Sequence, residues 1–357
     1  FSSLGESVVP VTKNREILGP SLLMDDIRGS EFVPIIASRI SDEELYSVNG
    51  NTLGNHYGIT KLMWYRQHQP ELYRRTDYFL SWAAFAAFML GAEASVDFSL
   101  ANRSLLFDLD AEEWSPRLIR LSGIDENKLP APVPSGTIIG KVSGLMGREL
   151  GLSPGTAIVS GAHDQCANSL GCGASVPGTA MFGMGTYLCI VPAYIGRKDG
   201  RAMRALGLNT EHHCIPGRYT SFIYNQGGSL VKWFRDALVL GGESVTQEKL
   251  SGLYGRLDNE MPDRPSSVLV LPHFSVTGPP YFLSDSSGLV AGLSLSTTRG
   301  DILKGVLEGA IYYLLETVDQ LPLIDVDINR MRIVGGGSKS DAWVQIAADI
   351  MNRPMER

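Results

Sequence analysis

The sequence predicts an α/β protein with two domains, and three observations lead to this prediction. The apolar run of residues 157–159 reads as a buried strand that stops at Gly161, shortly before Asp164. A second apolar run, residues 331–334, leads into three glycines and then into a helical pattern. A chain of 357 residues is long for a single hydrophobic core and suits two domains.

Asp164 is the first candidate for chemistry. Side chains just beyond the carboxyl end of a strand lie where open α/β sheets bind their ligands. The run that ends at Gly161 therefore predicts Asp164 at such an edge. The alternative is that Asp164 merely caps a helix that begins near Cys166. This segment alone leaves both interpretations open.

Two glycine-rich turns predict close approach of a ligand to the backbone. Residues 335–337 are all glycine, so a flat or charged ligand meets no side chain there. A linker would have the same composition, but the apolar patterns on both sides favour a strand, a turn and a helix, with Ser338 and Asp341 resembling a capping box. Residues 179–182 and 187–191 predict a hairpin around the turn 183–186, whose amides would hold a phosphate. In isolation, an ordinary tight hairpin explains that pattern equally well.

The remaining elements follow from periodicity. A helix-rich stretch is predicted from about residue 61 to 90, where aromatic residues recur at helical spacing as core. A second hairpin is predicted around 216–217, and residues 268–271 read as a buried strand. After 227–229 a short helix is expected, and residues 301–321 form one apolar helical face that indicates packing.

Composition excludes several classes of protein. Hydrophobic residues make up 44% and charged residues 19% of the chain, which is typical of a globular protein and not of a disordered one. The net charge of -7 and the scattered basic residues give no reason to expect nucleic acid. No apolar run approaches the length of a membrane span. We therefore expect a cytoplasmic protein with a small anionic cofactor and no membrane or nucleic-acid partner.

Cysteine and histidine patterns predict no protein-only metal site. The four cysteines show no CxxC pair, so we expect buried thiols in a reducing compartment. His212 and His213 are adjacent, and neighbouring residues of a strand point to opposite faces, so they do not easily share one ion.

The ordered set of motifs resembles the FGGY family of carbohydrate kinases, members of the actin, Hsp70 and hexokinase superfamily. The resemblance runs through most of the chain, and its anchors are residues 161–165, 177–180, 183–186, 271–274, 288–293 and 335–346. It implies two ribonuclease-H-like α/β domains that flank a cleft. Residues 1–172 would be the sugar-binding domain and 173–357 the nucleotide-binding domain, both incomplete. Asp164 would lie on one wall of the cleft, with Gly185 and Gly335 on the other.

The resemblance also implies an activity and a set of site residues. The expected reaction is ATP-dependent phosphorylation of a small sugar or polyol, with a keto-pentose such as xylulose first and glycerol, gluconate or a tetritol as further candidates. Mg²⁺ would accompany ATP. Asp164 would be the catalytic base. The residues expected to bind substrate are Glu6, Asp26, Arg28 and Gln165, and those expected to bind the nucleotide are Gly185, Thr186, Gly335, Gly336 and Gly337.

Two expectations concern what the family carries and this sequence does not. Family members begin with an Asp-x-Gly-Thr phosphate and Mg²⁺ motif and continue beyond the point that matches Arg357. We therefore expect an internal fragment that is inactive by itself. Two alternatives to a sugar kinase stay open: an actin-like or Hsp70-like ATPase without a sugar substrate, and an inactive pseudokinase. A homodimer is a further possibility.

Overall fold

The computed structural model describes residues 1–241 and 247–357, and the chain divides into two compact units. The first unit comprises 1–170, 195–201 and 209–220, and the second comprises 171–194, 202–208 and 221–357. The first unit thus also contains two later segments that the sequence-based division at residue 172 gave to the second domain. Among the described residues, no helix is both long and apolar enough to cross a membrane.

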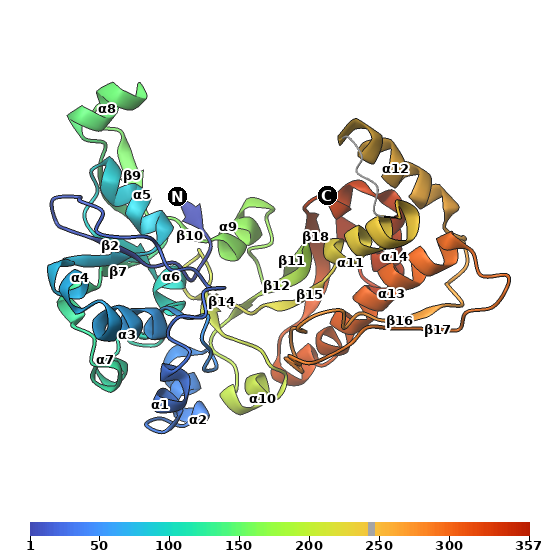
Figure 1. Ribbon diagram of the computed structural model, residues 1–357, viewed down its shortest axis with the longest axis horizontal. Coiled ribbons are helices and arrows are strands. Elements are labelled where there is room, and N and C mark those ends of the chain that lie inside the picture. The colour runs from blue at the N-terminus through green and yellow to red at the C-terminus, as the bar shows by residue number, and fades with distance from the viewer. Residues whose placement is uncertain (242–246) are drawn as a thin grey trace. The chain divides into compact units, whose positions relative to one another are not determined.

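The first unit consists of short helices and paired strands (Figure 1). Two pairs of its strands are parallel: β1 with β10, and β4 with β7. Four pairs are antiparallel: β2 with β3, β5 with β6, β8 with β9, and β13 with β14. The helices are α1 (Phe32–Ala37), α2 (Asp42–Asn49), α3 (Gly58–His68), α4 (Pro70–Arg75), α5 (Trp82–Leu90), α6 (Phe98–Asn102), α7 (Pro116–Ser122), α8 (Gly144–Leu150) and α9 (Asp164–Gly171). The strands are β1 (Ser2–Ser3), β2 (Val9–Val11), β3 (Tyr78–Leu80), β4 (Ser95–Asp97), β5 (Phe107–Asp108), β6 (Glu113–Trp114), β7 (Ala131–Val133), β8 (Ile138–Lys141), β9 (Ala157–Val159), β10 (Ala162–His163), β13 (Glu211–His212) and β14 (Arg218–Thr220).

The helix-rich stretch predicted for 61–90 is present, but it is interrupted. Helices α3, α4 and α5 occupy it, and β3 separates the last two. Pro70 begins α4, as expected for a residue whose fixed φ suits the first helical turn. The predicted aromatic packing is observed in part, since Tyr65 and Phe79 are buried in the main core of this unit and Phe85 packs against it, whereas Trp82 is 40% exposed.

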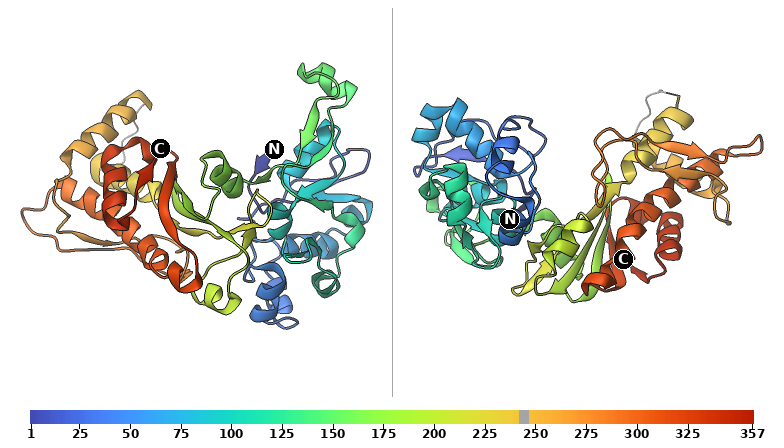
Figure 2. Two further views of the ribbon diagram at one scale, coloured as in Figure 1. Left: turned by 180° about the vertical axis from the view of Figure 1, so that it is seen from behind. Right: turned by 90° about the horizontal axis from the view of Figure 1, so that it is seen from below.

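The second unit is built on a mixed sheet in the order β15, β12, β11, β18, β19. Figure 2 shows the ribbon from two further sides. Strand β11 pairs antiparallel with β12 and parallel with β18, which puts the carboxyl ends of β11 and β18 at one edge. Helix α13 packs against α14 and β15. The strands are β11 (Gly178–Met184), β12 (Tyr187–Ile195), β15 (Ile223–Gln226), β16 (Leu269–Leu271), β17 (Leu289–Ala291), β18 (Ile328–Val334) and β19 (Met355–Glu356). The helices are α11 (Gly228–Phe234), α12 (Gln247–Glu260), α13 (Arg299–Val318) and α14 (Asp341–Met351). Helix α10 (Gly200–Ala205) begins in the first unit and ends in the second.

Three details of the prediction are corrected by the fold. Strand β16 is not buried throughout, because β17 is its one partner among the described strands and Leu269 is 70% exposed. The N-cap of α14 is Ser340, whose hydroxyl accepts a hydrogen bond from the Trp343 amide. Ser338 instead donates to the Gly335 carbonyl at 2.7 Å. All four cysteines are free, but only Cys166 is fully buried.

Candidate active site

Asp164 lies where a strand of the first unit gives way to a helix. It follows the last residue of β10 and is the first residue of α9. The local sequence explains this geometry. Gly161 lets β10 run beside β1, because a side chain there would occupy the space of the Phe1 backbone carbonyl. The Asp164 side chain is 47% exposed, so its carboxylate is accessible although His163 is buried.

A chain of charged side chains runs from Asp164 into the core. His163 lies between two carboxylates, with Nε2 3.3 Å from Asp164 Oδ1 and Nδ1 2.8 Å from Glu211 Oε1. The other oxygen of Glu211 is 3.5 Å from the Arg103 guanidinium. Arg103 also forms an ion pair with Glu6. We call these five side chains the Glu6–Asp164 network. It connects two residues that the sequence predicted separately.

The inner part of the network is dry. Glu211 is completely buried, Glu6 is 4% exposed, and the Arg103 side chain is 11% exposed. Burying a carboxylate costs free energy unless a cation and hydrogen bonds compensate its charge. Arg103 is the cation beside both Glu6 and Glu211, so it stabilises two buried acids. Gly5 allows the close packing, since a Cβ there would lie 2.8 Å from Arg103 Cγ. A small cavity of about 40 Å³ adjoins Glu6 and Arg103.

Sequence reasoning missed three members of the network: His163, Arg103 and Glu211. His163 lies within the 161–165 motif, which predicts no separate role for it. Glu211 lies in the predicted hairpin that the structure contains as β13 and β14. The available signal was a charged residue inside a strand, which indicates a buried partner, but the sequence does not say which arginine supplies it.

A further acid, Asp97, is buried beside this network. It is the N-cap of α6, where its side chain accepts hydrogen bonds from the Leu100 amide and the Ser99 hydroxyl. Burial raises the pKa of Asp97 from 3.8 to about 6, and the nearby Glu211 carboxylate acts in the same direction. Asp97 therefore changes charge within the pH range that is easily studied.

We expect Asp97→Asn to flatten the dependence of stability on pH. Because the folded-state pKa of Asp97 is raised, its contribution to stability is complete below pH 4 and is lost as pH rises towards 6. With about 1.4 kcal/mol for each pKa unit, the loss is about 3 kcal/mol. Asparagine keeps the oxygen that caps α6 and does not ionise. Urea unfolding at pH 4 to 7 measures the effect, and parallel curves for both proteins would contradict it.

One group of side chains in the described residues has the spacing of a metal site: His163, Cys166 and Glu211, whose donor atoms lie within 4.8 Å of one another. The existing contacts favour hydrogen bonds instead. His163 Nδ1 is bonded to Glu211, and the Arg103 cation adjoins the same carboxylate. Burial raises the pKa of Cys166 well above its ordinary value, whereas a thiol binds metal as a thiolate. Mg²⁺ in particular prefers oxygen ligands, so this group does not suit it.

Asp26 and Arg28 form a second charged element of the first unit. Arg28 Nε lies 2.8 Å and 2.9 Å from the two Asp26 oxygens, and this bond lowers the pKa of Asp26 to about 2. Buried Lys61 donates to the backbone carbonyls of both residues. The described contacts of this pair join it to its own loop and to α3, not to the Glu6–Asp164 network. Gln165 is half-buried, next to Asp164 in α9.

The predicted nucleotide-binding glycines come together in the second unit. Gly185 and Thr186 form the exposed turn between β11 and β12. Gly335 follows β18, which is parallel to β11 with Gly183 opposite Val334. A Cβ on Gly335 would lie 2.8 Å from the Met184 carbonyl, and its φ of +96° favours glycine. The two turns therefore meet at one edge of the sheet.

Glycines 336 and 337 have different roles in this edge. A Cβ on Gly336 would meet no atom within 4 Å, so this residue faces open space. A Cβ on Gly337 would lie 2.6 Å from the Trp343 ring. Gly337 is thus needed for packing on α14, and Gly336 leaves the backbone accessible to a flat ligand.

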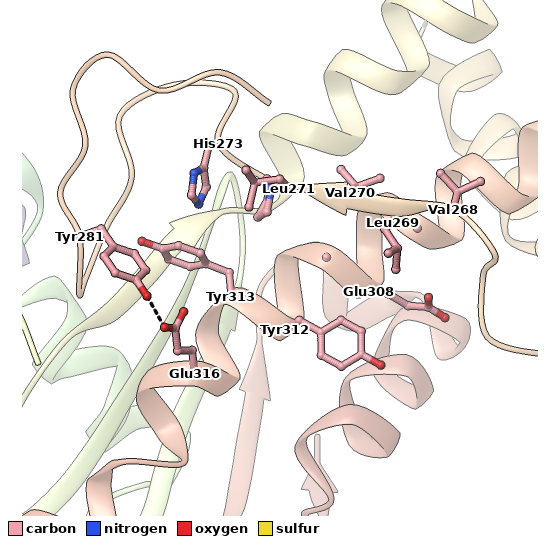
Figure 3. A pocket seen from close by; sticks show the side chains of 13 residues that line it. Val268, Leu269, Val270, Leu271, His273, Tyr281, Glu308, Tyr312, Tyr313 and Glu316 are labelled. Atoms are coloured by element: carbon pink, nitrogen blue, oxygen red, sulfur yellow. Dashed lines mark hydrogen bonds between the residues drawn. The ribbon is translucent and has the colours of Figure 1, made fainter. Parts of the chain in front are cut away.

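A separate cavity of about 360 Å³ lies between β16, the following loop and α13 (Figure 3). Its walls include Tyr281, Tyr312 and Tyr313. The two carboxylates at its rim already accept hydrogen bonds, Glu316 from the Tyr281 hydroxyl and Glu308 from the Ser266 amide. None of the predicted site residues lines it.

Comparison with known proteins identifies the family. The model of the N-terminal domain of the FGGY family of carbohydrate kinases matches residues 1–171, and the model of the C-terminal domain of that family matches residues 209–357. The xylulose kinase of Staphylococcus epidermidis is 25% identical over all of this chain, which covers 69% of that relative. The gluconokinase of Bacillus subtilis is 24% identical over 98% of this chain, which covers 68% of it.

A solved structure agrees with these matches. The xylulose kinase of Rhodospirillum rubrum has a TM-score of 0.86 and 25% identity, with 99% of this chain and 70% of that chain covered. The predicted fold class, α/β with two domains of the actin and hexokinase type, is therefore confirmed. So is the predicted class of enzyme, a phosphotransferase. Two domain models that together match most of the chain show that it belongs to the FGGY family of carbohydrate kinases.

Proposed function

We propose that Asp164 is the catalytic base of a kinase that transfers the terminal phosphoryl group of ATP to a hydroxyl of a small sugar or polyol. The observation that carries this proposal is the position of Asp164, which is accessible at a strand end and backed by a buried charged network. A sugar hydroxyl is a poor nucleophile, and a carboxylate within hydrogen-bond reach removes its proton as the oxygen attacks phosphorus.

The other residues would bind and orient the two substrates. Gln165 would hold a second hydroxyl beside the base. Gly185 and Thr186 would contact the β- and γ-phosphates, while the bare backbone of 335–337 would take the adenine and ribose. The open space at Gly336 supports this assignment. Positioning supplies most of the catalysis in phosphoryl transfer, so these contacts matter as much as the base.

We also propose that Mg²⁺ arrives with the nucleotide. Mg²⁺ is usually held by substrate phosphates, waters and one or two carboxylates, and it neutralises the developing phosphate charge. The one donor group with metal-ligand spacing in the described part of the chain contains a thiol and an imidazole. Glu211 is the one oxygen donor of that group, so the phosphates would provide the principal ligands.

A keto-pentose such as xylulose is our first candidate substrate, followed by gluconate, glycerol and a tetritol. Glu6 would accept hydrogen bonds from substrate hydroxyls. Asp26 and Arg28 would contact the end of the sugar that is farthest from the reacting hydroxyl. Glu6 forms an ion pair with Arg103, and this fixed position of its carboxylate supports its use as an acceptor. The relatives named as xylulose kinase and gluconokinase support xylulose as the first candidate and gluconate among the others.

A panel of substrates tests the proposal. The full-length enzyme with Mg²⁺-ATP should release ADP when given ketoses, polyols or sugar acids, and one class should be preferred by kcat/KM. Mass spectrometry should find one phosphate on the accepted compound. ATP hydrolysis that no compound stimulates would favour an actin-like ATPase, and ATP binding without turnover on any compound would favour an inactive pseudokinase.

A further inference from the structure

His163 occupies a position that the proposed reaction does not yet use. Its ring lies between Glu211 and Asp164, with contacts of 2.8 Å at Nδ1 and 3.3 Å at Nε2. It is 6% exposed. The contact with Glu211 is a hydrogen bond, and the contact with Asp164 is within ion-pair distance. The ring thus bridges the core to the base.

The surroundings hold this ring in one orientation. The His163 amide donates to the Ser99 hydroxyl at 2.8 Å, which fixes the backbone of β10 from α6. Glu211 is fixed in turn by Arg103, and the Cys166 thiol lies 3.3 Å from the Glu211 oxygen that faces the ring. A buried ring with partners on both edges loses its rotameric freedom on folding rather than on substrate binding. The bridge is therefore preorganised.

Each edge of the His163 ring has an acidic partner. Nδ1 faces Glu211, whose other oxygen lies 3.5 Å from the Arg103 guanidinium, and Nε2 faces Asp164. A ring nitrogen that carries a proton towards Asp164 holds one oxygen of that carboxylate, and the contact with Glu211 sets the orientation of the ring.

We propose that His163 is a positioning residue that holds Oδ1 of Asp164, with Glu211 orienting the ring, so that Oδ2 faces the substrate hydroxyl. The inference rests on the proposed role of Asp164 as the base. In the reaction, the substrate O–H bond breaks and its proton moves to Asp164. The oxygen forms a bond to the γ-phosphorus while the bond from that phosphorus to the ADP oxygen breaks. His163 takes no part in these bond changes and acts only through Asp164.

Two replacements of His163 separate its two contacts. His163→Asn keeps an amide nitrogen near the position of Nδ1, so it retains a donor for Glu211 and loses the contact with Asp164. His163→Gln places the amide nitrogen near the position of Nε2, so it retains a donor for Asp164 and loses the contact with Glu211. If His163 positions the base, His163→Asn should lower kcat about 10²-fold, the usual effect of a misplaced catalytic group. His163→Gln should recover most of that loss.

Steady-state kinetics and nucleotide titration of the full-length enzyme measure this split. KM for ATP and the Kd of ADP should stay unchanged in both variants, because His163 contacts neither substrate. A purely structural role predicts the reverse order, with His163→Gln impaired because Glu211 loses its bond, and His163→Asn normal. Stoichiometric zinc that is lost in His163→Asn would also overturn the proposal, since His163 would then be a ligand.

A double-mutant cycle tests the positioning role of His163 separately from the proposed role of Asp164 as the base. If His163 acts through Asp164, His163→Asn should cause no further loss in an Asp164→Asn background. Near-normal turnover of Asp164→Asn alone would refute the proposed base. A large effect of Asp164→Asn together with a normal His163→Asn enzyme would refute only the positioning role.

A control variant and the second variant of His163 secure the experiment. His212→Asn is the matched control, because His212 is buried in the same unit and its Nε2 contacts only the Leu109 carbonyl among the hydrogen bonds given for it. It should affect thermal stability and leave kcat unchanged. If His163→Asn fails to fold, His163→Gln carries the test. This variant keeps a donor for Asp164, so kcat should stay within a few-fold of the parent enzyme although Glu211 loses its bond, and a 10²-fold loss of kcat would overturn the proposal.

Discussion

Asp164→Asn is expected to abolish nearly all phosphoryl transfer while nucleotide binding persists. The amide has the same shape as the carboxylate and accepts no proton at neutral pH, and a positioned base contributes about 10²–10⁴-fold in rate. The base acts on the sugar hydroxyl, so the Kd of ADP should change little. Coupled ADP release measures kcat, and isothermal titration measures nucleotide affinity.

Asp42→Asn is the matched control for this experiment. Asp42 is also an exposed aspartate in the first turn of a helix of the first unit, α2. Loss of charge at such a position weakens the interaction with the helix dipole by about 0.3–1 kcal/mol and has no catalytic consequence. If both variants turned over at a similar rate, Asp164 would not be the base.

Arg103→Met is expected to produce the largest loss of stability among the network variants. Methionine fills much of the arginine volume, but it leaves Glu6 and Glu211 buried beside an apolar side chain. Removal of one partner of a buried ion pair costs about 3–5 kcal/mol, because the remaining charge is not compensated. Urea unfolding at pH 7, followed by circular dichroism, should show a markedly lower midpoint.

Arg117→Met provides the comparison. Arg117 forms an ion pair with Glu44, but the side chains are 43% and 44% exposed, so water solvates both charges. Exposed pairs contribute about 0–1 kcal/mol. If the two variants lost equal stability, burial would not explain the role of Arg103. The difference between them therefore measures the cost of leaving the two buried acids without a cation.

The sequence predicted those parts of the candidate site that depend on local chain geometry. Asp164 was placed at a strand end because an apolar run and a glycine precede it, and β10 and α9 meet at that residue. The glycines around 185 and 335 were placed after strands for the same reason. Hydrogen bonds within a turn and steric limits on φ act over a few residues, so a short segment carries this information.

The errors concern contacts between distant segments. Residues 269–271 form a strand as predicted, but its exposure depends on β17, which alone pairs with it in the described structure. The N-cap of α14 moved from Ser338 to Ser340 because Ser338 bonds to the carbonyl of Gly335. In both cases the local pattern allowed two arrangements, and packing selected one.

By itself, the sequence determined the family and the class of fold, and it predicted a candidate base and two glycine turns, because each of these depends on short motifs whose order is specific. Only the tertiary structure connected Glu6, Arg103, Glu211 and His163. Glu211 lies 48 positions from His163, and Arg103 lies 97 positions from Glu6. Which acid receives which cation depends on burial, since an exposed charge is satisfied by water and a buried one needs a specific partner.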